Sequence, residues 1–277
     1  MSLNDTLESA SARATHTRRD LIRGGVSLGL AAAAFGALPR GARASSPAKG
    51  STCLTILYAA GPGLRFDADY YRDHHLVTIM KLYGRSIGRF ELRTVDAPAA
   101  AGAAGGAPPA PHYAAAVNIW VADPEAFEAG NKAHGATLVA DVPHFTNAPA
   151  TIQYDSVEGA MGADASAIKV GDHCLTILYP NKPDVRWDVD YYRAHHMPLI
   201  MRLYGAKAIR RFELRKGQKA QMGGKPPPFV GTVNIYIEDQ AAFEAAGRAH
   251  GQELRNDVPH FSSQQPEAFP TTVYGVA

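Results

Sequence analysis

The sequence holds two clusters of tyrosine and histidine, YYRDHH at residues 70–75 and YYRAHH at residues 191–196. In a helix, Tyr71 and His75 share one stripe, because residues four apart are neighbours on its surface. Imidazole acts as a general acid or base near neutral pH, and a phenol can donate a hydrogen bond to a developing oxyanion. The candidate catalytic residues, placed between a helix and a sheet, are therefore Tyr71, His75, Tyr192 and His196. The alternative is that they are buried helix residues that only pack and hydrogen-bond.

Two further histidines occur in the pentapeptide DVPHF, at residues 141–145 and 257–261. We predict a turn at this pentapeptide, and turns often carry functional side chains. His144 and His260 are therefore candidate substrate-binding residues at a pocket rim, or alternatively caps on a neighbouring helix. His134 and His250 each precede a glycine at the predicted end of a helix, which indicates ordinary capping.

These motifs recur because most of the sequence is written twice. Three more segments return in the same order: CLTILY at 53–58 and 174–179, FELR at 90–93 and 212–215, and VNI at 117–119 and 233–235. Repetition this dense predicts two copies of one domain. We place the domains at residues 45–160 and 174–277, with a linker at 161–173.

Each copy is expected to contain four strands and two helices. In the first copy the predicted strands are Cys53–Tyr58, Arg89–Thr94, Ala115–Val121 and Thr151–Val157, with helices from Asp67 to Gly84 and from Asp123 to about Leu138. This order is β-α-β-β-α-β, the ferredoxin-like split unit. In the second copy, Pro198 is expected to kink its helix.

The third strand of each copy has one apolar face and one mixed face, because side chains alternate along a strand. The mixed face carries Asn118 and Trp120 in the first copy and Asn234 and Tyr236 in the second. Two such faces would cover each other if the copies packed together. We therefore predict an α+β fold, two tandem ferredoxin-like repeats that form an intramolecular pseudo-dimeric α+β barrel. The four side chains either bind substrate inside the barrel or pair across the interface between the copies.

The helix segment WDVDYYRAHHMPL at residues 187–199 resembles the signature of the EthD family, and DVPHF followed by a strand is similar to the end of the same domain. The resemblance covers nearly all of residues 53–157 and 174–276. It implies a fold of the dimeric α+β barrel group and an oxidoreductase-type activity, and it maps the family's histidine onto His196 and His75. The first copy departs from the signature, since Leu76 and Val77 stand where the second has Met197 and Pro198.

Residues 1–44 are expected to be a targeting segment. They contain the twin-arginine pattern TRRDLIR at 17–23, an apolar run from Gly24 to Leu38, and the small-residue sequence Ala42-Arg43-Ala44. We predict export to the periplasm by the twin-arginine route, with cleavage after about Ala44; the alternative is an uncleaved amphipathic tail. The apolar run is too short for a comfortable membrane span, so a membrane-embedded protein is not expected.

Charge and motif content exclude several classes of function. The formal net charge is +2, and residues 1–44 hold six arginines against three acidic residues, so the remainder is close to neutral and lacks a nucleic-acid footprint. No His-x-x-x-His or Cys-x-x-Cys pair and no Gly-x-Gly-x-x-Gly occurs, so we predict neither a metal site nor a nucleotide cofactor. Cys53 and Cys174 open the same strand in the two copies and are expected to be buried, inert thiols.

The sequence thus favours an exported enzyme that needs no cofactor. Its expected partner is a small apolar or aromatic metabolite, and its chemistry is of oxidoreductase, isomerase or lyase type in a catabolic role. The alternatives are a periplasmic small-molecule binding protein without catalysis and a haem-binding barrel protein. Association of the fused pair into a further homodimer is left open.

Overall fold

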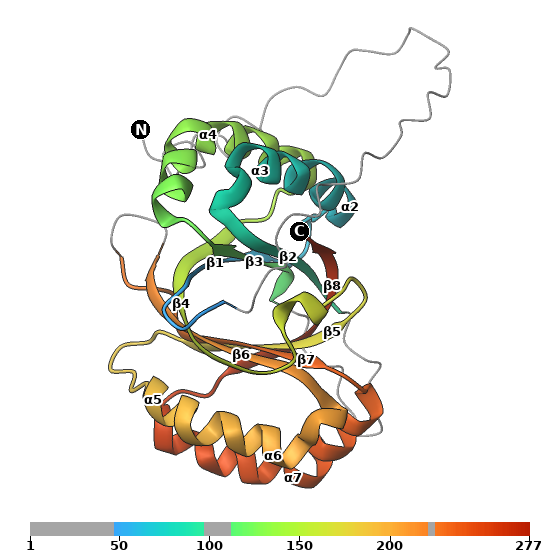
Figure 1. Cartoon of the computed structure of the whole chain (residues 1–277), viewed down its shortest axis with the longest axis vertical. Coiled ribbons are helices and arrows are strands. Elements are labelled where there is room, and N and C mark those ends of the chain that lie inside the picture. The colour runs from blue at the N-terminus through green and yellow to red at the C-terminus, as the bar shows by residue number, and fades with distance from the viewer. Residues whose placement is uncertain (1–46, 97–111, 221–224) are drawn as a thin grey trace, which may run out of the picture. The chain divides into compact units, whose positions relative to one another are not determined.

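The computed structural model describes residues 47–96, 112–220 and 225–277. The predicted targeting segment therefore lies outside the described residues. The described residues belong to one compact unit that spans Ala44–Ala277. Figure 1 shows this unit as a barrel of strands with a pair of long helices packed on each of two opposite sides.

Both repeats have the predicted β-α-β-β-α-β order. The first contains β1 (Thr52–Ala59), α2 (Ala68–Tyr70), a π-helical turn (Tyr71–His75), α3 (Leu76–Tyr83), a 3₁₀ turn (Gly84–Ser86), β2 (Ile87–Val95), β3 (Tyr113–Val121), α4 (Pro124–Phe145) and β4 (Ala150–Gly162). After a 3₁₀ turn (Ala165–Ala167), the second contains β5 (His173–Pro180), α5 (Val189–Tyr191), a π-helical turn (Tyr192–His196), α6 (Met197–Ala208), β6 (Ile209–Ala220), β7 (Phe229–Ile237), α7 (Gln240–Phe261) and β8 (Glu267–Val276).

The strands form one closed antiparallel barrel in the order β1-β3-β2-β8-β5-β7-β6-β4. Each repeat supplies four adjacent strands, and the repeats join where β2 pairs with β8 and β4 pairs with β6. The predicted fold is confirmed, and the repeats share edge hydrogen bonds in addition to facing each other. Closure removes the exposed sheet edges that each repeat would have alone.

Alternation along β3 separates the two environments as predicted. Val117 and Ile119 are buried in a core beneath the helices, whereas Asn118 and Trp120 point to the other face and are also buried, inside the barrel. A buried face that is polar needs hydrogen-bond partners, and the repeats supply them to each other.

Two local predictions were wrong. The helix expected to end near Leu138 continues to Phe145, so that DVPHF is its last turn and contains Pro143. The Arg65 guanidinium donates hydrogen bonds to the carbonyls of Pro143 and His144, which satisfies acceptors that the end of a helix leaves free. A single proline there removes one backbone bond and is tolerated.

The helix around Pro198 is not kinked at the proline. Both repeats have the π-helical turn before this position, although the first has Val77 there, so proline does not cause the turn. Pro198 lies in the first turn of α6, where its missing N–H is tolerated. The non-helical residue of α6 is Gly205, with φ 73°, a region that favours glycine.

Candidate active site

A histidine–aspartate pair lies between the helices and the sheet in the second repeat. His196 is 4% exposed, and its Nδ1 lies 2.7 Å from Oδ2 of Asp257. Tyr191 donates its hydroxyl to the other carboxylate oxygen of Asp257 at 3.0 Å. The first repeat has the same three-residue arrangement with nearly the same distances, made by His75, Asp141 and Tyr70.

The pair suits His196 to act as a base. An aspartate that accepts from Nδ1–H fixes the tautomer and leaves Nε2 as the nitrogen that can take a proton from a ligand. Burial lowers the pKa of His196 below 6.5, and the hydrogen bond to Asp257 offsets only part of this effect. Burial opposes ionisation of Asp257, but the hydrogen bonds from His196 and Tyr191 outweigh it and lower the pKa of that carboxyl. The imidazole is therefore neutral at pH 7 beside a charged carboxylate.

The aspartates were missed as site residues from the sequence. Asp141 and Asp257 open the repeated DVPHF motif, which is the signal that could have found them. The motif was assigned to a turn, and only its extension into a helix turns the carboxylate toward the histidine 61 residues away in the second repeat.

The tyrosine beside each histidine has a buried hydroxyl group that makes no regular hydrogen bond. Tyr192 is fully buried, and within the described part of the chain its hydroxyl interacts with that of Tyr179 without regular hydrogen-bond geometry. Its ring lies 4.8 Å from that of His196 and edge-on to Tyr179. Burial holds its pKa well above 10, so the hydroxyl stays protonated and can donate. Tyr71 is buried in the same way in the first repeat, where its hydroxyl interacts with that of Tyr58.

In the second repeat these groups line a cavity of about 170 Å³ between the sheet and the helices α6 and α7. Its wall includes Tyr179, Tyr192 and His196 together with the apolar side chains Ile177, Ile235 and Val258. An apolar cavity of about 150 Å³ in another protein binds benzene or xenon, so this space suits a small organic molecule. The structure thus brings a base, a hydrogen-bond donor and an apolar binding wall to one place.

A larger hollow of about 570 Å³ lies elsewhere, between α4 and the ends of β1, β4 and β6. Its wall contains Phe127, Tyr154 and Lys219 but none of the predicted catalytic residues. Size alone does not make it the site, because the convergence of polar groups on an apolar pocket is the better indicator of function.

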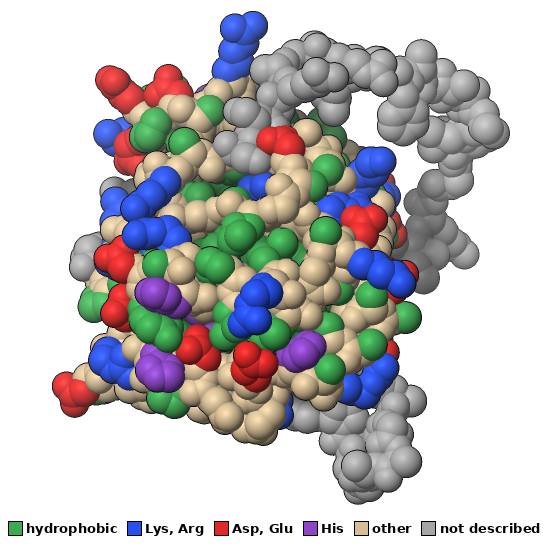
Figure 2. All heavy atoms as spheres, turned by 60° about the horizontal axis from the view of Figure 1, so that its bottom comes forward, with side chains coloured by type: hydrophobic (Ala, Val, Ile, Leu, Met, Phe, Trp, Pro, Cys, Tyr) green, Lys and Arg blue, Asp and Glu red, His purple; other side chains and the backbone are tan. Residues whose placement is uncertain are grey.

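The predicted substrate-binding histidines lie at the surface beside the site. His144 and His260 occupy the last turn of α4 and α7, and their side chains are 63% and 61% exposed. Each stacks on the tyrosine that bonds the aspartate, with ring centroids 5.7 Å apart for Tyr70 and 5.6 Å apart for Tyr191. Figure 2 shows histidines among acidic and hydrophobic side chains on one face of the molecule. Their role in binding substrate stays a prediction.

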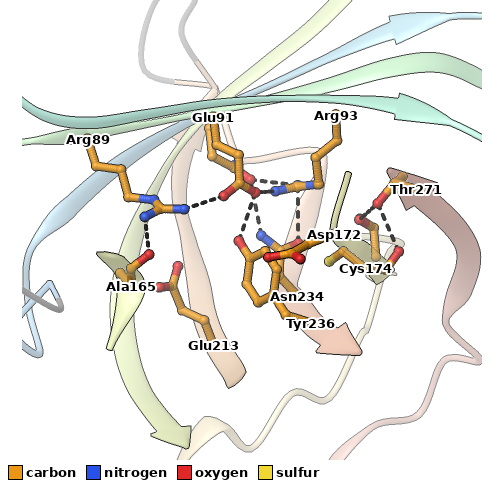
Figure 3. Close-up of polar contacts among 12 residues, drawn as sticks. Arg89, Glu91, Arg93, Ala165, Asp172, Cys174, Glu213, Asn234, Tyr236 and Thr271 are labelled. Atoms are coloured by element: carbon orange, nitrogen blue, oxygen red, sulfur yellow. Dashed lines mark hydrogen bonds and ion pairs between the residues drawn. The ribbon is translucent and has the colours of Figure 1, made fainter. Parts of the chain in front are cut away.

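The remaining substrate-binding candidates lie inside the barrel and connect the repeats. Trp120 donates to Glu213 at 3.0 Å, and Tyr236 donates to Glu91 at 2.8 Å. Asn234 donates to Asn118 at 3.1 Å. In Figure 3, Arg89, Glu91 and Arg93 reach from β2 toward Asn234 and Tyr236 on β7. The structure therefore places these four candidates in cross-repeat hydrogen bonds, away from the cavity at His196.

Buried ion pairs hold the middle of this network. Glu91 is fully buried and accepts from the guanidinium groups of Arg89 and Arg93. Burial alone would raise the pKa of Glu91, but the two arginines outweigh it and the pKa is lowered. The second repeat repeats the arrangement, with Glu213 between Arg211 and Arg215.

Both cysteines are buried free thiols, as predicted. Burial raises the pKa of Cys53 to about 12 and that of Cys174 to about 11. Since the thiolate is the reactive form, neither should react with iodoacetamide at about pH 8 in the native protein. Mass spectrometry of the treated protein should show no added carbamidomethyl group, whereas the same treatment in denaturant should add two. Rapid modification of the native protein would show that the barrel interior opens.

Comparison with known proteins finds a family match within the second repeat. Residues 187–265 match the model of the EthD domain. A search of the curated proteins found no match. Among solved structures, an EthD-like protein from Ralstonia eutropha is 25% identical; the likeness covers 37% of this chain and 91% of that protein, with a TM-score of 0.34.

Two other similar structures match most of this chain over most of their own length. An anthrone oxidase-like protein is 13% identical over 84% of this chain and 94% of its own, with a TM-score of 0.46. A mutant chlorite dismutase from Candidatus Nitrospira defluvii is 8% identical over 82% of this chain and 92% of its own, with a TM-score of 0.41. None of these likenesses bears on the role of individual residues. Residues 187–265, which match the EthD domain model and hold Tyr192, His196 and Asp257, form part of an α+β barrel.

Proposed function

We propose that this protein is an acid–base enzyme that removes a proton from a small apolar or aromatic molecule bound in the second repeat. His196 takes the proton on Nε2, Asp257 stabilises the imidazolium that forms, and Tyr192 donates a hydrogen bond to the oxygen on which negative charge develops. Such chemistry covers isomerisation, elimination and the first step of cofactor-free oxygenation, and it requires no cofactor for the proton transfer itself.

One observation carries the proposal: a neutral histidine paired with a carboxylate and a buried, protonated tyrosine line the same apolar cavity. A buried hydroxyl without a regular hydrogen bond lowers stability by roughly 1–3 kcal/mol. A ligand oxygen that accepts from Tyr192 would recover this free energy. A purely structural histidine would not need a cavity beside it.

We also propose that the enzyme works in the periplasm after cleavage of a twin-arginine signal near Ala44. The pattern at residues 17–44 supports this proposal, although those residues lie outside the described part of the chain. Within the described residues, none of the helices is long and apolar enough to cross a membrane. N-terminal sequencing of the protein recovered from the periplasm tests the cleavage position.

The opening of 1,2-benzisoxazole tests the proposed chemistry. A base removes the proton on carbon 3, the electron pair of that C–H bond completes the nitrile, and the N–O bond breaks to give 2-cyanophenolate. The reaction needs only a base, and the product is followed by its absorbance. The protein should accelerate the opening above the buffer rate with saturation kinetics. Saturable binding of benzisoxazole without acceleration would favour the binding protein without catalysis.

The pH dependence of this reaction follows from the lowered pKa of His196. The base is the neutral imidazole, so activity should rise with pH to a plateau, and the midpoint of the rise should lie below pH 6.5. The measurement is kcat/KM between about pH 4 and pH 8. A midpoint above 6.5 would mean that the charge of Asp257 dominates over burial, and would contradict this description of the site.

A further inference from the structure

We infer that the chain binds its small molecule in the second repeat only, because two side chains of β4, Ile152 and Tyr154, fill the corresponding space in the first. The inference rests on the proposed ligand site and adds which residues open or close it. Ala268 and Pro270 stand at the matching positions of β8 and leave the cavity open.

The strand register establishes which residues correspond. In the first repeat, Ile56 of β1 pairs with Ile152 of β4, and the equivalent Ile177 of β5 pairs with Ala268 of β8. Two positions along the same strands, Leu54 pairs with Tyr154, and the equivalent Leu175 pairs with Pro270. The first repeat therefore has two large side chains where the second has a methyl group and a proline ring.

These two side chains point toward the helices. Side chains alternate along a strand, and Gln153 and Asp155 on either side of Tyr154 are buried in the barrel interior. Ile152 and Tyr154 pack instead against the apolar core under α3 and α4. Burial raises the pKa of Tyr154, and Glu128 of α4 raises it further, which agrees with a phenol lying against that helix.

Residues next to these positions are more buried in the first repeat than in the second, as expected if Ile152 and Tyr154 fill the space. Leu54 and Ile56 are 6% and 9% exposed, whereas their equivalents Leu175 and Ile177 are only half-buried and line the cavity. The equivalent aromatic residues of the paired helices follow the same trend: Tyr83 and Phe127 are buried, and Tyr204 and Phe243 are half-buried.

The helix on the opposite side of this space also differs between the repeats. Val139 of α4 is buried in the first repeat. Its equivalent on α7, Arg255, is exposed and lies at the cavity. The catalytic pair itself is intact in both repeats, since the histidine–aspartate distance is 2.7 Å in each. The repeats therefore differ in access to the pair and in the volume beside it.

Benzene is a suitable probe, and equivalent isoleucine residues in the two repeats can report where it binds. The methyl groups of Ile200 and Ile235 line the second-repeat cavity, and Ile79 and Ile119 are their first-repeat equivalents. In methyl NMR spectra of the whole protein, benzene should shift Ile200 and Ile235 and leave Ile79 and Ile119 unchanged. Equal shifts in both sets would overturn the inference while leaving the proposed site intact, and shifts in neither set would contradict the proposed site as well.

Exchanging the residues at these two positions between the repeats tests whether they decide which repeat can bind the small molecule. The variant A268I/P270Y, which carries the first-repeat residues, should bind benzene about 10-fold more weakly or worse, because a filled cavity must open before it can bind. The variant I152A/Y154A should gain benzene-induced shifts at Ile79 and Ile119. A268I alone is the milder form, should the double variant fail to fold. Benzene affinity unchanged in A268I would overturn the assignment of this position as the one that opens the cavity.

Discussion

A His196→Gln variant should open 1,2-benzisoxazole about 10²- to 10⁴-fold more slowly than the wild-type protein, the usual contribution of a general base. Glutamine keeps much of the side-chain volume and can still donate to Asp257, but it has no basic nitrogen for the proton. The measurement is kcat/KM at a pH above 6.5, where the His196 imidazole of the wild-type protein is neutral. Benzene shifts at Ile200 and Ile235 should persist, because the apolar wall of the cavity is unchanged.

The matched control for this variant is His195→Gln. His195 is the neighbouring residue on the same π-helical turn, but it is exposed, contacts the ring of Tyr191 and does not line the cavity. Its replacement should change kcat/KM by less than about twofold, since it does not touch the ligand space. Equal loss of activity in the two variants would show that disturbance of the turn, and not loss of the base, is responsible.

A Glu91→Gln variant should lower the free energy of unfolding by about 3–5 kcal/mol. Glutamine has nearly the same shape as glutamate, so the substitution creates little empty volume. It removes the only charge that lies between Arg89 and Arg93 on β2, and it leaves two guanidinium groups in the barrel interior without that carboxylate. Urea unfolding followed by circular dichroism measures the effect.

The control for the buried pair is an exposed one. Glu244 pairs with Arg248 on the surface of α7, with side chains 55% and 72% exposed. Replacement of Glu244 by glutamine should change the free energy of unfolding by no more than about 1 kcal/mol, because solvent screens exposed pairs. If Glu91→Gln cost as little as this, the buried network would contribute no more than a surface pair and its role in joining the repeats would be refuted.

Some of the fold and site could be predicted because they depend on short stretches of chain. The spacing of Tyr192 and His196 places them on one face of any helix, and alternation along β3 sends Asn118 and Trp120 to the face opposite Val117. The helix end was predicted wrongly for a related reason. Pro143 favours termination locally, whereas the partners that allow α4 to continue come from Arg65, far away in sequence.

The sequence by itself determined the two-fold repetition, the β-α-β-β-α-β order and the polar interior of the barrel, because strand alternation, helix spacing and caps are local properties of the chain. Only the tertiary structure decided which histidine faces a usable space. The partner Asp257 lies 61 residues from His196, and the pairing of β5 with β8 sets Ala268, which lines the cavity, opposite Ile177. Volume between a helix and a sheet depends on every element that borders it, so two repeats with the same histidine–aspartate pair differ in the space beside it.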